Sequence, residues 1–289
     1  MKRKDFIALS SLGLLGLYAC GTSNMMNSKK PLAIQLYTIR DAISENLEKA
    51  LEKLATMGFK QIEIYGYNGK FFGKSRVEFQ NILKNVGLEV ISSHHTTGVI
   101  HNEKGTLLND WEKSVEDLHY IGSKYMVCSY LFEEERTMEN YKKLPELLNK
   151  SGEITKKAGI DFAYHNHDFE FEKFDETKTV YDFILDNTSS DLVKMELDLY
   201  WISKSGFDPL FYFEKYQGRF PLWHIKDMKA QSKDFTEIGN GIINFKKIFE
   251  SREKAGLKHW FLEQDSSDKD IFESIAISKE YIGKNSFFR

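Results

Sequence analysis

Short stretches rich in β-forming residues alternate with amphipathic stretches eight times between residues 32 and 282, and this alternation is the strongest constraint on the fold. Several of the amphipathic stretches end at a glycine, as expected at a helix C-terminus. Strands that alternate with helices form parallel sheets, and eight such units predict an α/β protein built as a single closed (β/α)8 TIM barrel over residues 31–289. An open doubly wound sheet is the alternative. The predicted strands are 32–38, 61–65, 88–94, 125–130, 160–167, 192–199, 221–228 and 259–264.

The N-terminal segment differs from the rest of the chain and is predicted to direct export. Basic residues precede an apolar run at 6–18, which is typical of a signal peptide and is predicted to span residues 1–19. The run is too short to cross a bilayer as a helix. Residues 17–21 (Leu-Tyr-Ala-Cys-Gly) resemble a bacterial lipobox, so Cys20 is the predicted lipidation site and residues 20–30 are a flexible tether. An ordinary secretory peptide with an incidental cysteine is the alternative.

This interpretation predicts a lipoprotein on a bacterial membrane, facing the periplasm or the cell exterior and touching the membrane only through its lipid. With Cys20 lipidated, Cys128 has no partner for an intramolecular disulfide, because the chain has 2 cysteines. The net charge of −3 argues against a nucleic-acid surface, so a small molecule is the expected ligand. A homo-oligomer is compatible with this composition. No dinucleotide, Walker or nucleophile-elbow motif is present.

Polar residues gather where the predicted strands end, and in a barrel that edge carries the active site. Alternation along the stretch 221–228 places His224 and Lys226 on one face. Imidazoles and carboxylates without thiolates suit a divalent ion such as Mn²⁺, Mg²⁺, Co²⁺ or Zn²⁺. The acidic run at 133–135 is instead predicted to be a solvated loop. In chain order the strand-end residues include Gln35, Tyr37, Glu63, His94, His95, His165, His167, Glu170, Glu196, Asp198, His224, Lys226, Glu263 and Asp265.

Several motifs in this order resemble the xylose-isomerase-like TIM-barrel superfamily, the sugar phosphate isomerase/epimerase group, over residues 32–283. The resemblance implies a divalent metal held by Asp198, His224, Glu263 and a fourth ligand from the predicted strand at 160–167. His165, His167 or Glu170 could supply that fourth ligand. The motifs are Gln-Leu-Tyr-Thr-Ile-Arg at 35–40, Tyr-His-Asn-His-Asp-Phe-Glu-Phe at 164–171, Asp-Leu-Tyr-Trp at 198–201, Gly-Arg-Phe at 218–220, His-Ile-Lys-Asp at 224–227, Gly-Asn-Gly at 239–241 and Glu263.

The same resemblance implies that the metal holds sugar oxygens while protein groups move a proton next to a carbonyl. The expected activity is therefore that of a sugar isomerase or epimerase, on an unphosphorylated sugar or sugar derivative because of the predicted compartment. The candidate catalytic residues are His165, Glu263 and Lys226. The candidate substrate-binding residues are Gln35, Tyr37, Glu63, His94, His95, His167, Glu170 and Trp201.

Two departures from the family pattern open alternatives. Epimerases of this family pair two carboxylate bases, whereas the corresponding region here reads Ala-Tyr-His at 163–165. Trp201 stands where the family places a substrate-binding histidine. One-base chemistry, in a 3-oxo-glycoside lyase or hydratase, is therefore the first alternative. A carbohydrate-binding lipoprotein without catalysis is the second.

Overall fold

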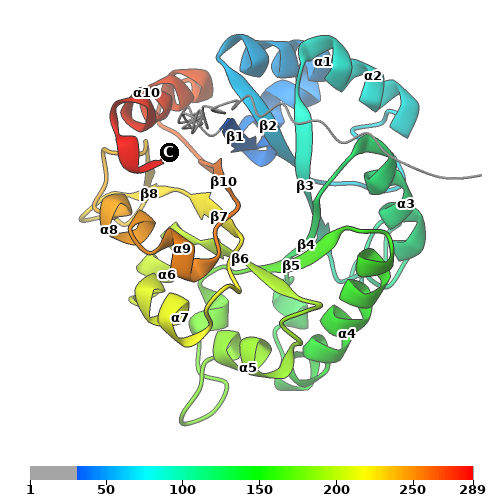
Figure 1. Cartoon of the computed structure of the whole chain (residues 1–289), viewed down its shortest axis with the longest axis vertical. Coiled ribbons are helices and arrows are strands. Elements are labelled where there is room, and N and C mark those ends of the chain that lie inside the picture. Colours follow the sequence, from blue (N-terminus) through cyan, green and yellow to red (C-terminus); the bar gives the residue numbers. More distant parts are fainter. Residues whose placement is uncertain (1–30, 289) are drawn as a thin grey trace, which may run out of the picture.

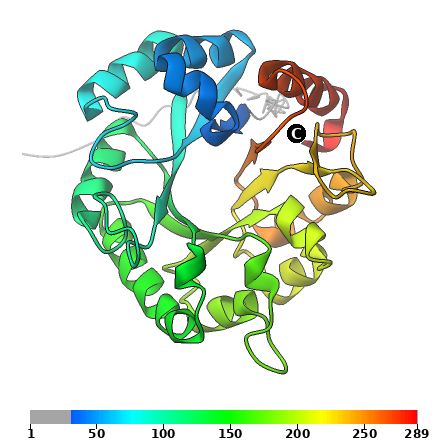
Figure 2. The same ribbon diagram turned by 180° about the vertical axis from the view of Figure 1, so that it is seen from behind.

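Eight parallel strands close into a barrel, and helices surround it (Figures 1 and 2). The computed structural model describes residues 31–288. The strand order is β1-β10-β7-β6-β5-β4-β3-β2, so the first strand pairs with the last and Ile34 lies beside Leu262. The predicted TIM barrel is thus confirmed. Its strands are β1 Leu32–Gln35, β2 Phe59–Ile64, β3 Glu89–Thr96, β4 Tyr125–Tyr130, β5 Asp161–His165, β6 Lys194–Asp198, β7 Leu222–Ile225 and β10 His259–Leu262.

The helices lie in the chain between the strands. They are α1 Arg40–Thr56, α2 Arg76–Val86, α3 Trp111–Ile121, α4 Met138–Lys157, α5 Val180–Asn187, α6 Leu199–Lys204, α7 Pro209–Lys215, α8 Phe245–Phe249, α9 Arg252–Ala255 and α10 Ile271–Lys284, with short 3-10 helices η1 Leu36–Ile39, η2 Glu133–Glu135, η3 Phe169–Phe171 and η4 Ser286–Phe288. Ser75 caps α2 through a reciprocal capping box with Glu78. Residues 245–255 form two short helices, α8 and α9, instead of one continuous helix.

Alternation along the strands sorts the apolar side chains into two groups. Phe162 and Tyr164 belong to the large group that includes the buried helix residues, whereas Ala163 between them belongs to a smaller group. The smaller group consists of Ala33, Ile91, Tyr125, Val127, Ala163, Leu222 and Phe261. All of its members lie on barrel strands, and they form the apolar layer inside the barrel.

The predicted first strand is too long. β1 ends at Gln35, and the chain turns at once into η1. The turn forms because Gln35 Oε1 accepts the N–H of Tyr37 at 3.0 Å. Tyr37 therefore lies on a turn instead of a strand, and 42% of its surface is exposed.

The predicted strand at 221–228 is also interrupted. Its first part is β7, and its end forms the two-residue strand β8 (Asp227–Met228), which pairs antiparallel with β9 (Phe235–Thr236). The Asp227 carboxylate accepts four backbone N–H groups, three of them from residues 239–243, at 2.8–3.2 Å. A Cβ at Gly241 would lie 2.1 Å from Asp227 Oδ1, so the loop closes around this carboxylate only because glycine is present.

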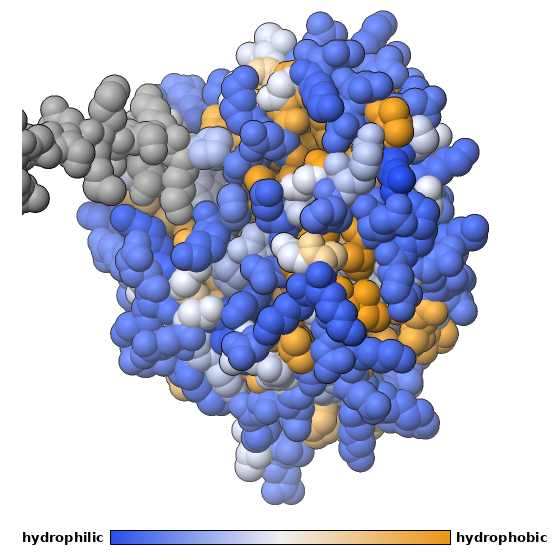
Figure 3. Space-filling view, turned by 45° about the vertical axis from the view of Figure 1, so that its right-hand side comes forward, coloured by the Kyte–Doolittle hydropathy of each residue, from blue (hydrophilic) through white to orange (hydrophobic). Residues whose placement is uncertain are grey.

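Within residues 31–288, no helix has the length and apolar character needed to cross a membrane. The side of the molecule in Figure 3 is mainly hydrophilic, with hydrophobic side chains in scattered patches. The predicted signal peptide at 1–19, the lipidation site Cys20 and the tether at 20–30 lie outside the described residues.

Candidate metal centre

The polar site lies next to the apolar layer inside the barrel, two residues further along each strand. Inward-facing positions recur every second residue, and at the next such position the residue type changes. Gln35 follows Ala33, His165 follows Ala163, His224 follows Leu222 and Glu263 follows Phe261. Strand periodicity therefore brings these polar side chains together inside the barrel, next to the apolar layer.

Three of these inward-facing side chains, His165, His224 and Glu263, form a cluster with Asp198 at or just after the ends of β5, β6, β7 and β10. We call these four residues the ligand cluster. His224 Nδ1 lies 2.6 Å from Glu263 Oε2 and 4.0 Å from Asp198 Oδ2. His165 Nε2 lies 3.8 Å from Asp198 Oδ2. Donor atoms of Asp198, His224 and Glu263 all lie within 4.8 Å of one another. Such spacing suits nitrogen and oxygen ligands of a single ion.

Two buried glutamates, Glu63 and Glu196, orient the histidines of the ligand cluster. His224 Nε2 lies 2.5 Å from Glu63 Oε2, and His165 Nδ1 lies 3.1 Å from Glu196 Oε2. His94 Nε2 contacts both carboxylates, at 3.0 Å and 2.7 Å. A metal-binding histidine usually directs its second nitrogen at such a carboxylate, which sets its orientation and raises its basicity.

His94, His165, Glu196 and His224 also lie close enough together to form a metal-binding group. The two groups share His165 and His224, whose opposite ring nitrogens face them. Each group contains one buried carboxylate oxygen without a hydrogen bond, Glu196 Oε1 in the second group and Asp198 Oδ2 in the ligand cluster. The groups differ in access, because Glu263 of the ligand cluster lines the cavity at the barrel mouth and Glu196 does not. We therefore assign the metal position to the ligand cluster.

The two carboxylate oxygens of Asp198 in the ligand cluster have different contacts. Oδ1 caps α6 by accepting the N–H groups of Tyr200 and Trp201 at 2.9 and 3.0 Å. Oδ2 is buried without a hydrogen bond, and the Lys226 ammonium lies 3.1 Å from it as an ion pair. A buried carboxylate oxygen that accepts no hydrogen bond and already faces a cation fits the role of a metal ligand. The roles of helix cap and metal ligand are thus compatible in one side chain.

Lys226 supplies a buried positive charge beside the ligand cluster. Its ammonium lies 2.7 Å from Glu263 Oε2 and 3.0 Å from Asp265 Oδ2, and the residue is 3% exposed. Burial alone would lower the pKa of Lys226, but the surrounding carboxylates, with Asp198 foremost, raise it well above its usual value. Lys226 is therefore protonated at neutral pH.

The remaining buried charges are balanced in the same way. Burial would raise the pKa of Glu63, but the charges of His94 and His224 outweigh it and hold that pKa well below its usual value. Burial and the neighbouring Glu63 raise the pKa of Glu196. Burial would lower the pKa of His94, yet the two glutamates raise it to about 9. The imidazoles thus compensate the glutamates.

Glu170 is not part of the ligand cluster. It lies in η3, where Oε1 accepts the hydroxyl of Tyr164 at 2.6 Å and Oε2 accepts the N–H of His167 at 2.8 Å. Tyr164 belongs to the outer apolar group, so Glu170 is directed away from the barrel interior. Burial raises the pKa of Glu170 to about 8.

The histidine pair at 94–95 divides between the two faces of β3. His94 turns inward to the glutamates, whereas His95 Nδ1 lies 2.7 Å from the Gly105 carbonyl oxygen and its ring packs against Trp111. His167 lies next to the ligand cluster, with its ring 5.0 Å from that of His165. Trp201 packs against His167 at 5.4 Å.

A cavity of about 1020 Å³ opens onto the ligand cluster. Among the predicted substrate-binding residues, those lining it are Tyr37, His94, His95, His167 and Trp201. Gln35 is buried below, where its side chain donates to Glu63 at 2.7 Å. The cavity thus offers aromatic surfaces next to a charged centre, a combination that suits a sugar derivative.

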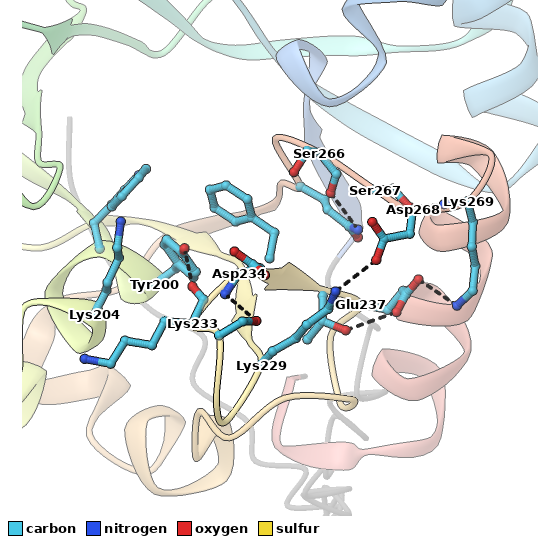
Figure 4. Close-up of a pocket in the computed structure, with 15 residues that line it drawn as sticks. Tyr200, Lys204, Lys229, Lys233, Asp234, Glu237, Ser266, Ser267, Asp268 and Lys269 are labelled. Atoms are coloured by element: carbon cyan, nitrogen blue, oxygen red, sulfur yellow. Dashed lines mark hydrogen bonds and ion pairs between the residues drawn. The ribbon is translucent and has the colours of Figure 1, made fainter.

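A second hollow of about 530 Å³ lies beside this cavity and shares Trp201 and Phe235 with it. Figure 4 shows lysines and carboxylates around this hollow. Lys229 pairs with Asp268 at 2.9 Å and Lys269 with Glu237 at 3.0 Å. Because these charges neutralise each other and no member of the ligand cluster lines the hollow, the chemical site belongs to the larger cavity.

Three residues of the site were not given their roles from the sequence. Glu196 stands two positions before Asp198, so strand alternation was the signal that it faces inward too. Asp265 lines the cavity next to Lys226. Glu135 contradicts the prediction of a solvated loop at 133–135: it is 2% exposed and accepts the N–H of Phe132 at 2.7 Å.

These features define a class of protein: a (β/α)8 barrel whose mouth holds a His, Asp and Glu cluster suited to a divalent metal ion. Residues 51–281 match the family model described as "Xylose isomerase-like TIM barrel", and the chain belongs to this family. The resemblance inferred from the motifs is thereby confirmed.

The chain is also similar to individual proteins of known name. Inosose dehydratase of Bacillus cereus (strain AH820) is 24% identical over 269 residues, which cover 81% of this chain and 88% of the relative. A sugar phosphate isomerase/epimerase from Parabacteroides distasonis ATCC 8503 has a similar structure, with TM-score 0.77, 28% identity and coverage of 92% and 97%. The IolI protein with a bound zinc atom shares the fold at TM-score 0.71, 16% identity and coverage of 90% and 99%.

Proposed function

We propose that this protein is a metal-dependent lyase or hydratase acting on an oxo-glycoside, a sugar derivative with a carbonyl two carbons from its glycosidic carbon. His165, Asp198, His224 and Glu263 would hold the divalent ion, for which Mn²⁺, Mg²⁺, Co²⁺ and Zn²⁺ are the candidates. When bound, such an ion polarises carbonyl and hydroxyl oxygens of a sugar. Asp198 Oδ2, which is buried and accepts no hydrogen bond, supports this assignment.

Lys226 and Asp265 carry out the proton transfer in this proposal. His165 Nε2 and Glu263 Oε2 face the other members of the ligand cluster and would bind the ion. Asp265 lines the cavity next to Lys226 and is therefore the carboxylate that remains for proton transfer. Asp265 takes the proton from the carbon between the carbonyl carbon and the glycosidic carbon. The electron pair forms a C=C bond, the glycosidic C–O bond breaks, and the leaving oxygen takes the proton back from Asp265. The Lys226 ammonium stabilises the negative charge that develops on oxygen.

The observation that carries the one-base proposal is the orientation of Glu170. A two-base epimerase needs bases on opposite faces of the sugar, and Glu170 was the carboxylate candidate on the β5 side. Its oxygens are instead engaged by Tyr164 and the His167 N–H. The relatives named inosose dehydratases support elimination chemistry as well.

Isomerisation or epimerisation is the second candidate function. The relative named a sugar phosphate isomerase/epimerase favours it, and His167 lies on the β5 side of the cavity, where a second base would stand. Both candidate reactions begin with loss of a proton next to the carbonyl, and they differ in the fate of the substituents.

The decisive experiment follows metal-loaded protein with oxo-glycosides in deuterated water by NMR. Elimination releases the aglycone, whereas an epimer or isomer keeps every substituent. Absence of both C–H exchange and aglycone release, with the sugar still bound, would leave only the carbohydrate-binding alternative.

Variants separate ligands from proton-transfer groups. Asp265→Asn and Lys226→Gln should each lower the rate by about 10²–10⁴-fold. Neither should weaken metal binding, because neither residue is in the ligand cluster. Glu263→Gln should weaken metal binding as well as the rate. Metal loss in Asp265→Asn, or full activity in Lys226→Gln, contradicts these roles.

We also propose that the barrel is carried on a lipid anchor at Cys20, on a bacterial membrane and facing the periplasm or the exterior. The support is the apolar run at 6–18 followed by Leu-Tyr-Ala-Cys-Gly. Mass spectrometry of the N-terminus tests it: a lipid-modified Cys20 is expected, and a mature chain that begins elsewhere without lipid would refute it.

A further inference from the structure

The main cavity continues well beyond the ligand cluster, toward the loops that follow β3 and β4. Tyr130 at the end of β4 lines this part of the cavity, together with the loop residues His101, Phe132 and Arg136. At about 1020 Å³ the cavity is at the upper end of the roughly 300–1,000 Å³ typical for drug-sized ligands. A single sugar ring held at the ligand cluster would leave much of this space to water.

A continuous row of rings leads along this extension, and we call it the aromatic row. The His167 ring lies 5.0 Å from that of His165 in the ligand cluster and 5.0 Å from that of Tyr130. Tyr130 lies 5.5 Å from Phe132, which lies 4.4 Å from His101. Tyr130 and Phe132 are only half-buried although their neighbours pack them firmly, so their remaining surface is available to a ligand.

The wall that carries Phe132 is held by a buried carboxylate. Glu135 accepts the Phe132 N–H through one oxygen and the Thr97 hydroxyl through the other. It therefore joins the loop after β4 to the loop after β3. Arg136 donates to the Tyr130 hydroxyl at 2.7 Å, and its guanidinium lies 3.8 Å from the centre of the Phe169 ring. These contacts hold Tyr130 and Phe132 in place before a ligand arrives.

We propose that the aromatic row is a subsite for a second ring of the substrate. The substrate is thus a two-ring glycoside: the oxidised sugar lies at the ligand cluster, and the aglycone presents a flat face to Tyr130 and Phe132. An aryl group and the apolar face of a second sugar share this chemistry. This inference rests on the proposed function, because it takes the ligand cluster as the place of reaction.

The test compares three unoxidised glucosides as binding probes: methyl β-glucoside, 4-nitrophenyl β-glucoside and cellobiose. Isothermal titration calorimetry on the metal-loaded full barrel measures each affinity without any turnover. The two-ring probes should bind more tightly than methyl glucoside. Phe132→Ala should lower the affinity for the tighter of the two-ring probes by about five- to ten-fold more than it lowers the affinity for methyl glucoside. Phe132→Tyr should retain the preference.

Phe211→Ala is the matched control. Phe211 lies on α7 with 56% of its surface exposed and does not line the cavity, so its loss should leave all three affinities unchanged. Preference for 4-nitrophenyl glucoside over cellobiose identifies an aryl aglycone, and the reverse identifies a second sugar. Equal affinity for one-ring and two-ring probes, equal effects of Phe132→Ala on both, or no binding of any probe would overturn the subsite.

A second assay distinguishes failure of the subsite from failure of the proposed reaction. The same proteins are assayed with the methyl and 4-nitrophenyl 3-oxo-glucosides. Probe binding that depends on Phe132 without aglycone release contradicts the reaction and leaves the subsite standing. Aglycone release with the same kcat/KM for both substrates, in the wild type and in Phe132→Ala, contradicts the subsite and leaves the reaction standing.

Discussion

Glu196→Gln is the substitution that most directly tests the assignment of the ligand cluster. Glu196 is fully buried, and Oε2 lies 2.7 Å from His94 Nε2, 3.1 Å from His165 Nδ1 and 3.3 Å from His224 Nε2. If His165 and His224 bind a metal through the nitrogens that face Asp198, Glu196 affects the metal only by orienting these two rings. The amide keeps the shape of the side chain and removes the negative charge.

The expected effect is a loss of metal affinity without a loss of fold. Removal of a carboxylate that orients metal-binding histidines typically costs about 10–100-fold in affinity. That factor corresponds to about 1.4–2.7 kcal/mol. Glu196 contacts both histidine ligands directly, at 3.1 and 3.3 Å, so we expect the upper part of this range.

Affinity is measured by competition between the protein and a chelator of known strength, with Mn²⁺ and Zn²⁺ in parallel. Circular dichroism and thermal unfolding of the metal-free protein check the fold. Asp117→Asn is the matched control, because Asp117 is also buried, accepts the Tyr67 hydroxyl at 2.6 Å and pairs with Arg76 at 2.9 Å, but lies outside the ligand cluster. An affinity of Glu196→Gln within about two-fold of wild type, far below the expected loss, or an equal loss in Asp117→Asn, would refute the reasoning.

Three further predictions follow from individual contacts. Asp198→Asn should lose metal binding but keep the cap of α6, whereas Asp198→Ala should also lose about 1 kcal/mol of stability; equal unfolding midpoints for the two variants would contradict the double role. The pKa of Glu170 is raised to about 8 in the folded protein, so Glu170 binds a proton that the unfolded chain releases, and its contribution to stability declines as pH rises from about 5 to 8. Urea unfolding should show that wild type loses up to about 1.4 kcal/mol per pH unit relative to Glu170→Gln, and parallel pH profiles would exclude this. Gly241→Ala should destabilise the loop around Asp227 by about 1–3 kcal/mol and expose it to proteases. Gly283→Ala, in α10 where a Cβ meets nothing within 4 Å, should be neutral or stabilising, and similar proteolysis of the two variants would contradict the steric argument.

The eightfold alternation of strand and helix patterns was sufficient to predict the barrel, because it arises from local periodicity and from the way parallel strands are connected. The same periodicity indicated which strand ends carry polar side chains. It also predicted that His224 and Lys226 share a face, and in the structure both contact Glu263. Element ends were predicted less well. They depend on single side-chain contacts, such as Gln35 with the Tyr37 N–H, that leave no periodic signal.

The tertiary structure decided the roles within the site. His165, His167 and Glu170 are equivalent candidates in the sequence, yet only His165 faces Asp198, while Glu170 is held by Tyr164. Contacts of this kind join residues far apart in the chain. His224 and Glu63 are separated by 161 positions, and Glu135 joins two loops. The sequence by itself determined the fold and the strand ends that carry the chemistry, because both follow from repeating local patterns. The partner of each buried charged group depends on how the barrel closes. Burying a charge costs free energy unless an opposite charge lies next to it, and here that charge comes from another strand.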